Sequence, residues 1–177
     1  LGIFLSLAFL SKYQAYLFGV TLFLAFLVFI IFLSKLAFSD DILKGFDAYK
    51  DKDYKRAFEI WYKLAEEGDP IAQNSLGVLF QKGQGTDQNF SLSYEWFRKS
   101  AEKGYTPAQV SLGYIYDQGM GIKKDKINAY MWWKIASLHG DSDAKTLLQI
   151  LLSEIDQNDK LIAQEKANEC LNNNFKN

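Results

Sequence analysis

Residues 72–104 read AQNSLGVLFQKGQGTDQNFSLSYEWFRKSAEKG, and residues 108–140 read AQVSLGYIYDQGMGIKKDKINAYMWWKIASLHG. The second stretch repeats the first after a step of 36 residues, and its alanine, leucine, glycine and aromatic positions coincide with those of the first. A fixed step of this size is typical of helical-repeat arrays, in which each unit buries its apolar face against its neighbours. The sequence therefore predicts a stack of repeated units that presents an extended surface.

Each unit divides into two helices, of which the first is predicted over Pro70–Lys82. Ala72, Leu76 and Leu79 recur at helical spacing and predict its buried face. Gly77 lies in the middle of this helix, where glycine costs about 1 kcal/mol relative to alanine. Because Gly113 repeats this cost one unit later, we expect a close approach between helices at both positions.

The loop that follows contains two glycines in each unit, in Gly83-Gln84-Gly85 and Gly119-Met120-Gly121. A glycine after a helix commonly adopts the left-handed conformation that ends it. A phosphate-binding loop is disfavoured, since there is no third glycine, no following Lys-Ser/Thr and no preceding strand. We expect these glycines to turn the chain.

The second helix is predicted over Asn89–Lys103, and its inner face alternates small and aromatic residues. Such alternation lets large side chains fill the gaps left by small ones on a neighbouring helix. We interpret the tryptophans and phenylalanines of this face as core residues and not as a ligand cage.

The repeat pattern extends in both directions from these two units. An earlier unit occupies residues 45–68, with a loop about five residues shorter and without the Gly-x-Gly. A further first helix follows Gly140, but Gln149 replaces its mid-helix glycine, so we expect it not to pack against a normal partner.

A final helix is predicted over Gln157–Leu171, with Asp156 as its N-cap. We expect Ile155, Leu161, Ile162 and Leu171 to close the end of the core. The predicted fold class is all-α, a short right-handed α/α solenoid of helix pairs preceded by an N-terminal hydrophobic helix.

The N-terminal segment is apolar on all sides. Residues 15–33 read AYLFGVTLFLAFLVFIIFL, and no charged residue lies between Lys12 and Lys35. As a helix, this segment would reach about 28 Å, which is close to the thickness of a bilayer's hydrocarbon core. It is either a signal peptide cleaved after Ser39 or an uncleaved membrane anchor. The predicted organisation is residues 1–39 as signal peptide or anchor, 40–155 as repeats, and 156–177 as a capping helix and tail.

Composition and charge exclude several classes of function. The net charge is -1, so nothing indicates a nucleic-acid-binding surface. Cys170 is the one cysteine and His139 the one histidine, which leaves no internal disulfide and little support for a Cys-His pair. Cys170 is either a free thiol or a partner in an intermolecular disulfide. We predict no catalytic, cofactor-binding or metal-binding residues.

The repeats resemble the Sel-one-like repeat family, a branch of the tetratricopeptide-like helical repeats. The match rests on Ala-Gln-x-x-Leu-Gly, the Gly-x-Gly loop and the aromatic-rich second helix, although Ser137 stands where the last alanine is expected. The resemblance covers about residues 42–152 and implies a superhelical adaptor that binds a protein or peptide. It also implies a bacterial exported protein, because many such members end in a polar helix. Some secreted members are described as binding or hydrolysing β-lactams, but they carry paired cysteines that this chain lacks.

The leading hypothesis is therefore a non-enzymatic, monomeric scaffold in the cell envelope, which binds an unknown protein or peptide. The alternatives are an envelope hydrolase of the β-lactam-binding type and a membrane-retained structural tether. If cleaved, the protein would be periplasmic or secreted; otherwise residues 15–33 would anchor it in the inner membrane with the repeats outside. In this fold class the first helices line the concave face, which predicts these binding residues: Asn74, Val78, Gln81, Val110, Tyr114 and Asp117.

Overall fold

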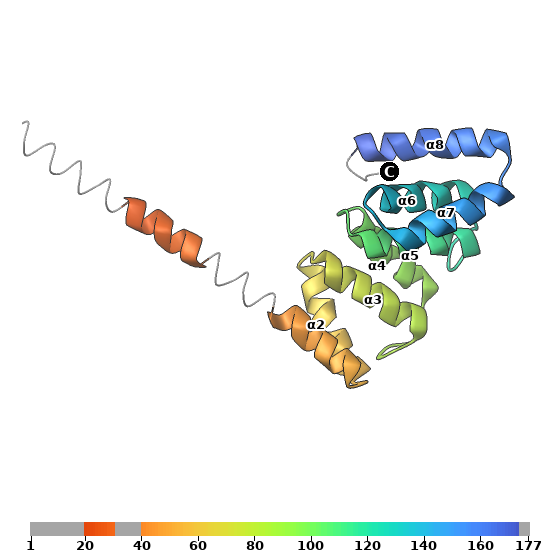
Figure 1. Ribbon diagram of the computed structural model, residues 1–177. Helices are drawn as coiled ribbons and strands as arrows, with labels where there is room; N and C mark the ends of the chain where they lie inside the picture. Colours follow the sequence, from red (N-terminus) through yellow and green to blue (C-terminus); the bar gives the residue numbers. More distant parts are fainter. Residues whose placement is uncertain (1–19, 31–39, 174–177) are drawn as a thin grey trace, which may run out of the picture. The chain divides into compact units, whose positions relative to one another are not determined.

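The computed structural model describes residues 20–30 and 40–173 (Figure 1). The chain divides into two units, Leu1–Asp41 and Ile42–Asn177. In the first unit, residues 20–30 are helical and their side chains are exposed. The remainder of the predicted apolar segment, Lys12, Lys35 and the cleavage position after Ser39 lie outside the described residues. Among the residues that are described, no helix combines the length and the apolar character needed to span a bilayer.

The second unit is built from helices alone throughout its described residues. Residues 42–50 are helical, and seven labelled helices follow them. Successive helices pack on one another from α2 to α7, and α8 packs on α6. The prediction of an all-α solenoid is confirmed. The helices are α2 (Tyr54–Glu66), α3 (Pro70–Lys82), α4 (Phe90–Ala101), α5 (Thr106–Gln118), α6 (Lys126–Leu138), α7 (Ser142–Glu154) and α8 (Gln157–Asn172).

Local capping residues set the ends of these helices. The Asp69 side chain accepts a hydrogen bond from the Ala72 amide at 2.7 Å and starts α3, with Pro70 in its first turn. Gly83 ends the same helix in the left-handed conformation. Asp156 caps α8 in the predicted way, because its carboxylate accepts from the Asp159 amide at 2.8 Å. Such caps satisfy backbone groups that a helix end leaves unpaired.

The mid-helix glycines allow the two helices of a pair to approach closely. A β-carbon on Gly77 would lie 2.8 Å from the ring of Phe97, which is fully buried. A β-carbon on Gly113 would likewise collide with Trp133, and one on Gly45 with Trp61. The predicted reason for the repeated glycine is confirmed. The contact between Gly45 and Trp61 shows that Gly45 is the equivalent of Gly77 in the first pair. Trp61 follows Gly45 by 16 residues, whereas Phe97 follows Gly77 by 20, because the loop of the first pair is shorter.

The second glycine of each loop connects neighbouring pairs. Gly121 has φ 72°, and a β-carbon there would lie 2.6 Å from the carbonyl carbon of Phe90, at the start of α4. The Ser91 hydroxyl donates a hydrogen bond to the Gly121 carbonyl at 3.3 Å. Gly85 meets the start of α2 at Tyr54 in the same way. These glycines therefore turn the chain, as predicted, and also seat each loop on the second helix of the preceding pair.

The last helix closes the core with small residues. α8 buries Ala163, Ala167 and Cys170 at helical spacing. The prediction for Leu161 and Ile162 is wrong, since they are 57% and 43% exposed. The large Trp132 of α6 fills the same part of the core as Ala167 and Cys170, so small side chains allow α8 to pack there.

Three other features of the C-terminal end bear on the sequence predictions. Ile155 is buried, as expected, and Leu171 packs partly against the core. Gln149 of α7 is exposed, and α8 packs on α6, so α7 has no ordinary second helix, as predicted. The thiol of Cys170 lies in the core, where burial raises its pKa. This position disfavours an intermolecular disulfide, because α8 would have to open to expose the sulfur.

Candidate functional site

The first helices of the solenoid present one shared face. Gly45, Gly77 and Gly113 each meet a buried aromatic ring, so residues 42–50 correspond in position to α3 and α5. The 36-residue step adds α7 to this set of first helices. The residue after each glycine, or after Gln149 in α7, lies at an equivalent position on its helix. These four residues are all apolar, and we call them the apolar row: Phe46, Val78, Tyr114 and Ile150.

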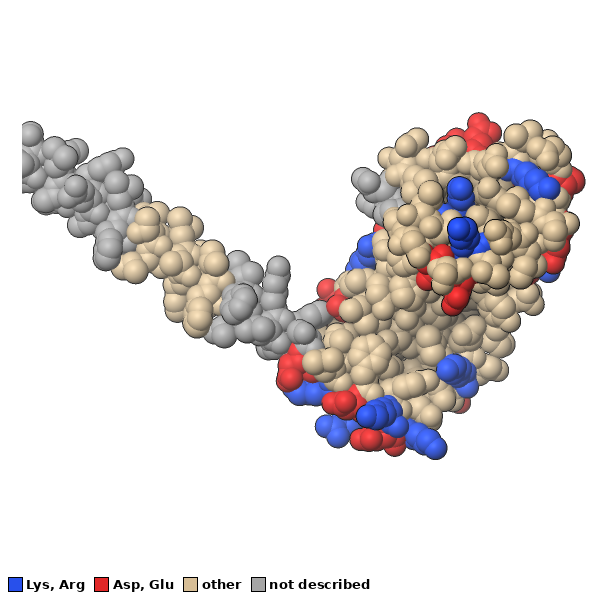
Figure 2. Space-filling view, in the orientation of Figure 1, with Lys and Arg blue, Asp and Glu red and all other residues tan. Residues whose placement is uncertain are grey.

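Much of the apolar row is open to solvent. Phe46 is 43% exposed, Tyr114 is 45% exposed and Ile150 is 53% exposed. Val78 is partly buried against the core that contains Phe97. Isolated exposed apolar residues are ordinary, but this row recurs at the same position on the four first helices of the stack, and clustered exposed apolar residues are typical of binding sites. In Figure 2, the surface over α3 in this view carries few charged atoms.

The end of the row opens into a small pocket between α5 and α7. Its volume is about 110 Å³, and Tyr114 and Ile150 lie on opposite sides of it. The Trp133 ring lies deeper and is held in place by its indole N–H, which donates to the Val110 carbonyl at 3.0 Å. A pocket with a fixed aromatic ring and apolar walls suits one apolar side chain. The lining residues are Tyr114, Asp117, Gln118, Trp133, Leu147, Ile150, Leu151 and Glu154.

Two carboxylates border this pocket, and each has a lysine nearby. The Lys126 ammonium lies 2.7 Å from Glu154, and its hydrogen bond lowers the pKa of that carboxyl group. Lys124 lies 4.0 Å from Asp117, whose other oxygen accepts a hydrogen bond from Gln118 at 2.6 Å. The pocket therefore combines apolar walls with a rim whose charges are already matched.

Polar residues flank the apolar row on both sides. One helical turn further along lie Tyr49, Gln81, Asp117 and Ser153. On the other side lies Asn74, whose side-chain oxygen is buried without a hydrogen-bond partner. Gln81 reaches across to the next loop, where its amide lies 3.9 Å from the Met120 sulfur. An apolar row with amide and hydroxyl groups beside it can contact both the side chains and the backbone of a bound peptide.

The structure places the six residues predicted to bind on the first helices α3 and α5. It brings Tyr114 and Asp117 together at the pocket, whereas Val78 and Val110 pack partly against the core clusters. Sequence reasoning missed two members of the row. Ile150 follows Tyr114 by the same 36-residue step and could have been found from it. Phe46 could not be found in this way, because the shorter loop of the first unit places it 32 residues before Val78 and not 36.

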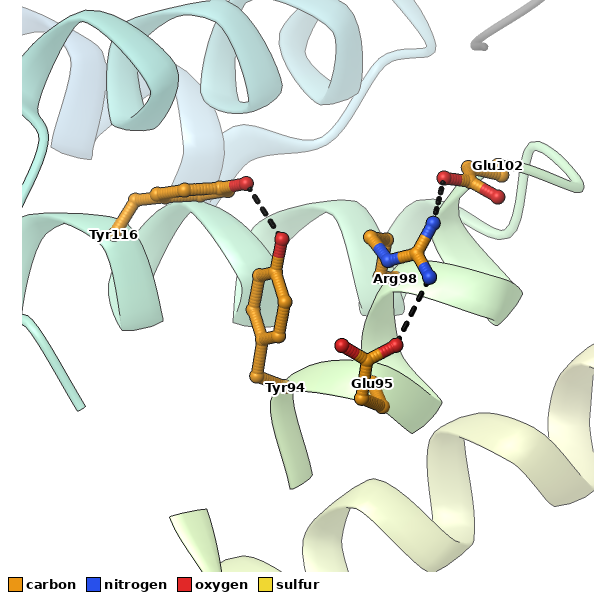
Figure 3. Close-up of polar contacts among 5 residues, drawn as sticks. All are labelled: Tyr94, Glu95, Arg98, Glu102 and Tyr116. Atoms are coloured by element: carbon orange, nitrogen blue, oxygen red, sulfur yellow. Dashed lines mark hydrogen bonds and ion pairs between the residues drawn. The ribbon is translucent and has the colours of Figure 1, made fainter. Parts of the chain in front are cut away.

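A second cavity, of about 410 Å³, lies beneath the loop between α5 and α6. The hydroxyls of Tyr94 and Tyr116 meet at 3.0 Å at its edge, as Figure 3 shows, and join α4 to α5. Burial and the Tyr94 hydrogen bond raise the pKa of Tyr116, so its phenol stays neutral. In the same view, Arg98 lies between Glu95 and Glu102 at 2.9 and 2.8 Å. Each of these polar side chains has a partner within the protein, which is typical of contacts that stabilise the fold.

Within residues 20–30 and 40–173, no three or more His, Cys, Asp or Glu side chains gather where they could hold a metal ion. His139 lies at the end of α6, where its Nδ1 is 3.2 Å from the Gln109 side-chain oxygen, and Cys170 is buried in the core cluster that contains Phe97 and Trp132. The candidate site of this chain is the apolar row with its flanking polar residues and the pocket between α5 and α7.

The stacked helix pairs and the surface along their first helices define a helical-repeat protein of the scaffold class. A model of the Sel1 repeat matches residues 35–69, 70–105 and 106–141. The chain belongs to the Sel1 repeat family, whose members are generally protein-binding scaffolds and typically not enzymes.

Two solved structures resemble this one. One is a protective antigen present in uropathogenic Escherichia coli strains and displaying an SLR fold, with 25% identity and a TM-score of 0.73; the match covers 78% of this chain and 31% of that one. The other is a Sel1 repeat protein from Oxalobacter formigenes, with 33% identity and a TM-score of 0.60, covering 63% of this chain and 46% of that one. This chain therefore spans less than half the length of either relative. The search of curated proteins found no match.

Proposed function

We propose that this protein is a non-enzymatic scaffold of the bacterial cell envelope, which holds a protein or peptide partner on its first-helix face. The observation that carries the proposal is the apolar row, which places exposed apolar side chains at one position on successive first helices. Folding does not require such exposure, since these side chains contribute little to the core while they face water. Binding a partner would bury them.

Export is the second part of the proposal. Its support is the uncharged stretch between Lys12 and Lys35, followed by an abrupt change to charged sequence at Asp40. N-terminal sequencing of the mature protein tests it. A mature chain that starts at Asp40 would establish cleavage, and retention of residues 15–33 in a membrane fraction would establish an anchor. A full-length chain in the cytosolic fraction would contradict export.

The binding face is tested by photo-crosslinking in cells. A photoreactive amino acid replaces Tyr114 in one variant and Leu161 in a control variant, since both positions are exposed and apolar but only Tyr114 lies on the first-helix face. We expect a discrete crosslinked partner from position 114, and loss of that product when Ile150→Asp is added. Equal crosslinking from both positions would contradict the assignment of the face.

A further inference from the structure

We infer that this chain has a second binding site, a cavity between the C-terminal ends of α2 and α4, which takes a small acidic α-amino acid. The cavity has a volume of about 420 Å³. None of its residues belongs to the apolar row or to the polar residues beside that row, so the site is separate from the face proposed to hold a partner. Its polar lining comes from Glu66, Gln73, Lys99, Glu102 and Lys103.

Gln73 presents a buried hydrogen-bond acceptor to this cavity. The residue is 3% exposed, and its side-chain N–H donates to the Ala65 carbonyl at 3.0 Å, which holds the amide in place. Its Oε1 is shielded from solvent, and no described residue donates a hydrogen bond to it. A buried oxygen in this state is uncommon, because most buried polar side chains are hydrogen-bonded. A ligand in the cavity would supply the donor that this oxygen lacks.

The next unit shows how the same glutamine is satisfied from within the protein. Gln109 follows Gln73 by 36 residues, and its Oε1 lies 3.2 Å from the Nδ1 of His139. The residue equivalent to His139 in the earlier position is Lys103, whose ammonium group donates instead to the Gly68 carbonyl. The unmatched oxygen is therefore specific to Gln73 and is not a general consequence of the repeat.

The cavity also carries charges without opposite partners. Lys99 and Lys103 are four residues apart at the end of α4, a spacing that brings like charges together at a cost in stability. In the described part of the chain, no salt bridge joins either lysine, or Glu66, to an opposite charge. Glu102 differs, because Arg98 lies 2.8 Å from its carboxylate. Two ammonium groups and one carboxylate are thus left for a ligand to match.

These groups together define the chemistry of the ligand. The unpaired ammonium groups outnumber the unpaired carboxylate, so the complementary molecule carries both signs of charge with an excess of negative charge. Its two carboxylates would contact Lys99 and Lys103, and its ammonium group would contact Glu66 and donate to the Oε1 of Gln73. Glutamate and aspartate carry these three groups, and a cavity of this volume is large enough for a small molecule.

Isothermal titration calorimetry of the purified full chain with L-glutamate tests the site. We expect saturable binding with a Kd of about 1 mM or tighter, which a ligand of this size can reach. Lys99→Gln should weaken binding about tenfold or more, because a charge-assisted contact is lost. Lys103→His should weaken it as much, since the imidazole would donate to Gln73 as in the next unit, and the urea midpoint should stay unchanged or rise. Lys145→Gln is the matched control, because this exposed lysine of α7 lies outside the cavity, and it should bind as the wild type does.

Two related compounds distinguish this site from a general attraction of anions to lysine. Glutarate has both carboxylates but no ammonium group, and L-alanine has the ammonium group but only one carboxylate. Each should bind about tenfold more weakly than L-glutamate, because each leaves a charged group of the site unmatched. Glutarate binding as tightly as L-glutamate would overturn the inference, as would the absence of L-glutamate binding at about 10 mM. An unchanged affinity in Lys99→Gln would also overturn it, and this exposed position keeps the test decisive even if Lys103→His does not fold.

Discussion

Replacing Gly113 by alanine tests the packing that sets the spacing of the helix pairs. The added β-carbon would collide with the indole ring of Trp133, whose N–H donates to the Val110 carbonyl at 3.0 Å. Trp133 is only 3% exposed, so its ring has little room to move, and any shift strains or breaks that hydrogen bond.

The size of the effect can be worked out from three contributions. Overpacking in a filled core costs about 1–3 kcal/mol. Leaving the buried indole donor unpaired costs about 1–3 kcal/mol. The higher helix propensity of alanine stabilises the folded state by about 1 kcal/mol and so offsets part of this loss. We therefore expect Gly113→Ala to lower the free energy of unfolding by about 1–5 kcal/mol, which combines these terms.

The assay is urea denaturation of the full chain, followed by far-ultraviolet circular dichroism. The midpoint should fall while the slope with urea stays constant, which separates a loss of stability from a change in the unfolded state. Gln149→Ala is the matched control, because Gln149 has the same register in α7 but is exposed; its change should stay within about 0.5 kcal/mol. If Gly113→Ala were as stable as the wild type or more stable, close approach would not explain the repeated glycine.

Other perturbations follow from the same contacts. Gly121→Ala should destabilise the chain by at least about 1–3 kcal/mol, because the residue has a left-handed backbone and abuts Phe90; a lowered urea midpoint would confirm it. Asp141→Ala removes the carboxylate that accepts from the Ala144 amide at 2.8 Å, and should cost about 1 kcal/mol in thermal or urea unfolding. The raised pKa of Tyr116 means that the folded state binds its proton more tightly than the unfolded state, so this contribution to stability is complete below pH about 10 and is lost as pH rises further. Tyr116→Phe should therefore flatten the alkaline loss of stability, and an unchanged pH profile would contradict this assignment.

Much of the fold follows from local sequence. The bounds of α3 follow from Asp69 and Pro70 at its start and Gly83 at its end, and the start of α8 follows from Asp156. Each of these signals acts within about one turn of helix, so it can be recognised without knowing the neighbouring helices. The 36-residue step then predicts how the units stack, because equivalent residues make equivalent contacts.

The binding face was only partly predictable. Helical spacing placed Tyr114 and Asp117 on one side of α5, and the structure brings both to the same pocket. The opposite wall of that pocket comes from Ile150 of α7, whose position depends on how α7 packs against α6. Phe46 joins the row only after its register is known, and the contact between Gly45 and Trp61 reveals that register.

The helices, their caps, the repeat and the need for glycine at close contacts all follow from local sequence, since these depend on chemistry within a helix or on an exact periodicity. The tertiary structure alone decided which side of α8 is buried. Leu161 and Ile162 are larger and more hydrophobic than Ala163 and Ala167, yet they lie outside. The reason is steric: Trp132 fills the core where Ala167 packs and Trp133 fills it where Ala163 packs, so only small side chains allow α8 to approach. A residue's hydrophobicity states how much burial would stabilise it, whereas the shape of its distant neighbours decides whether burial is possible.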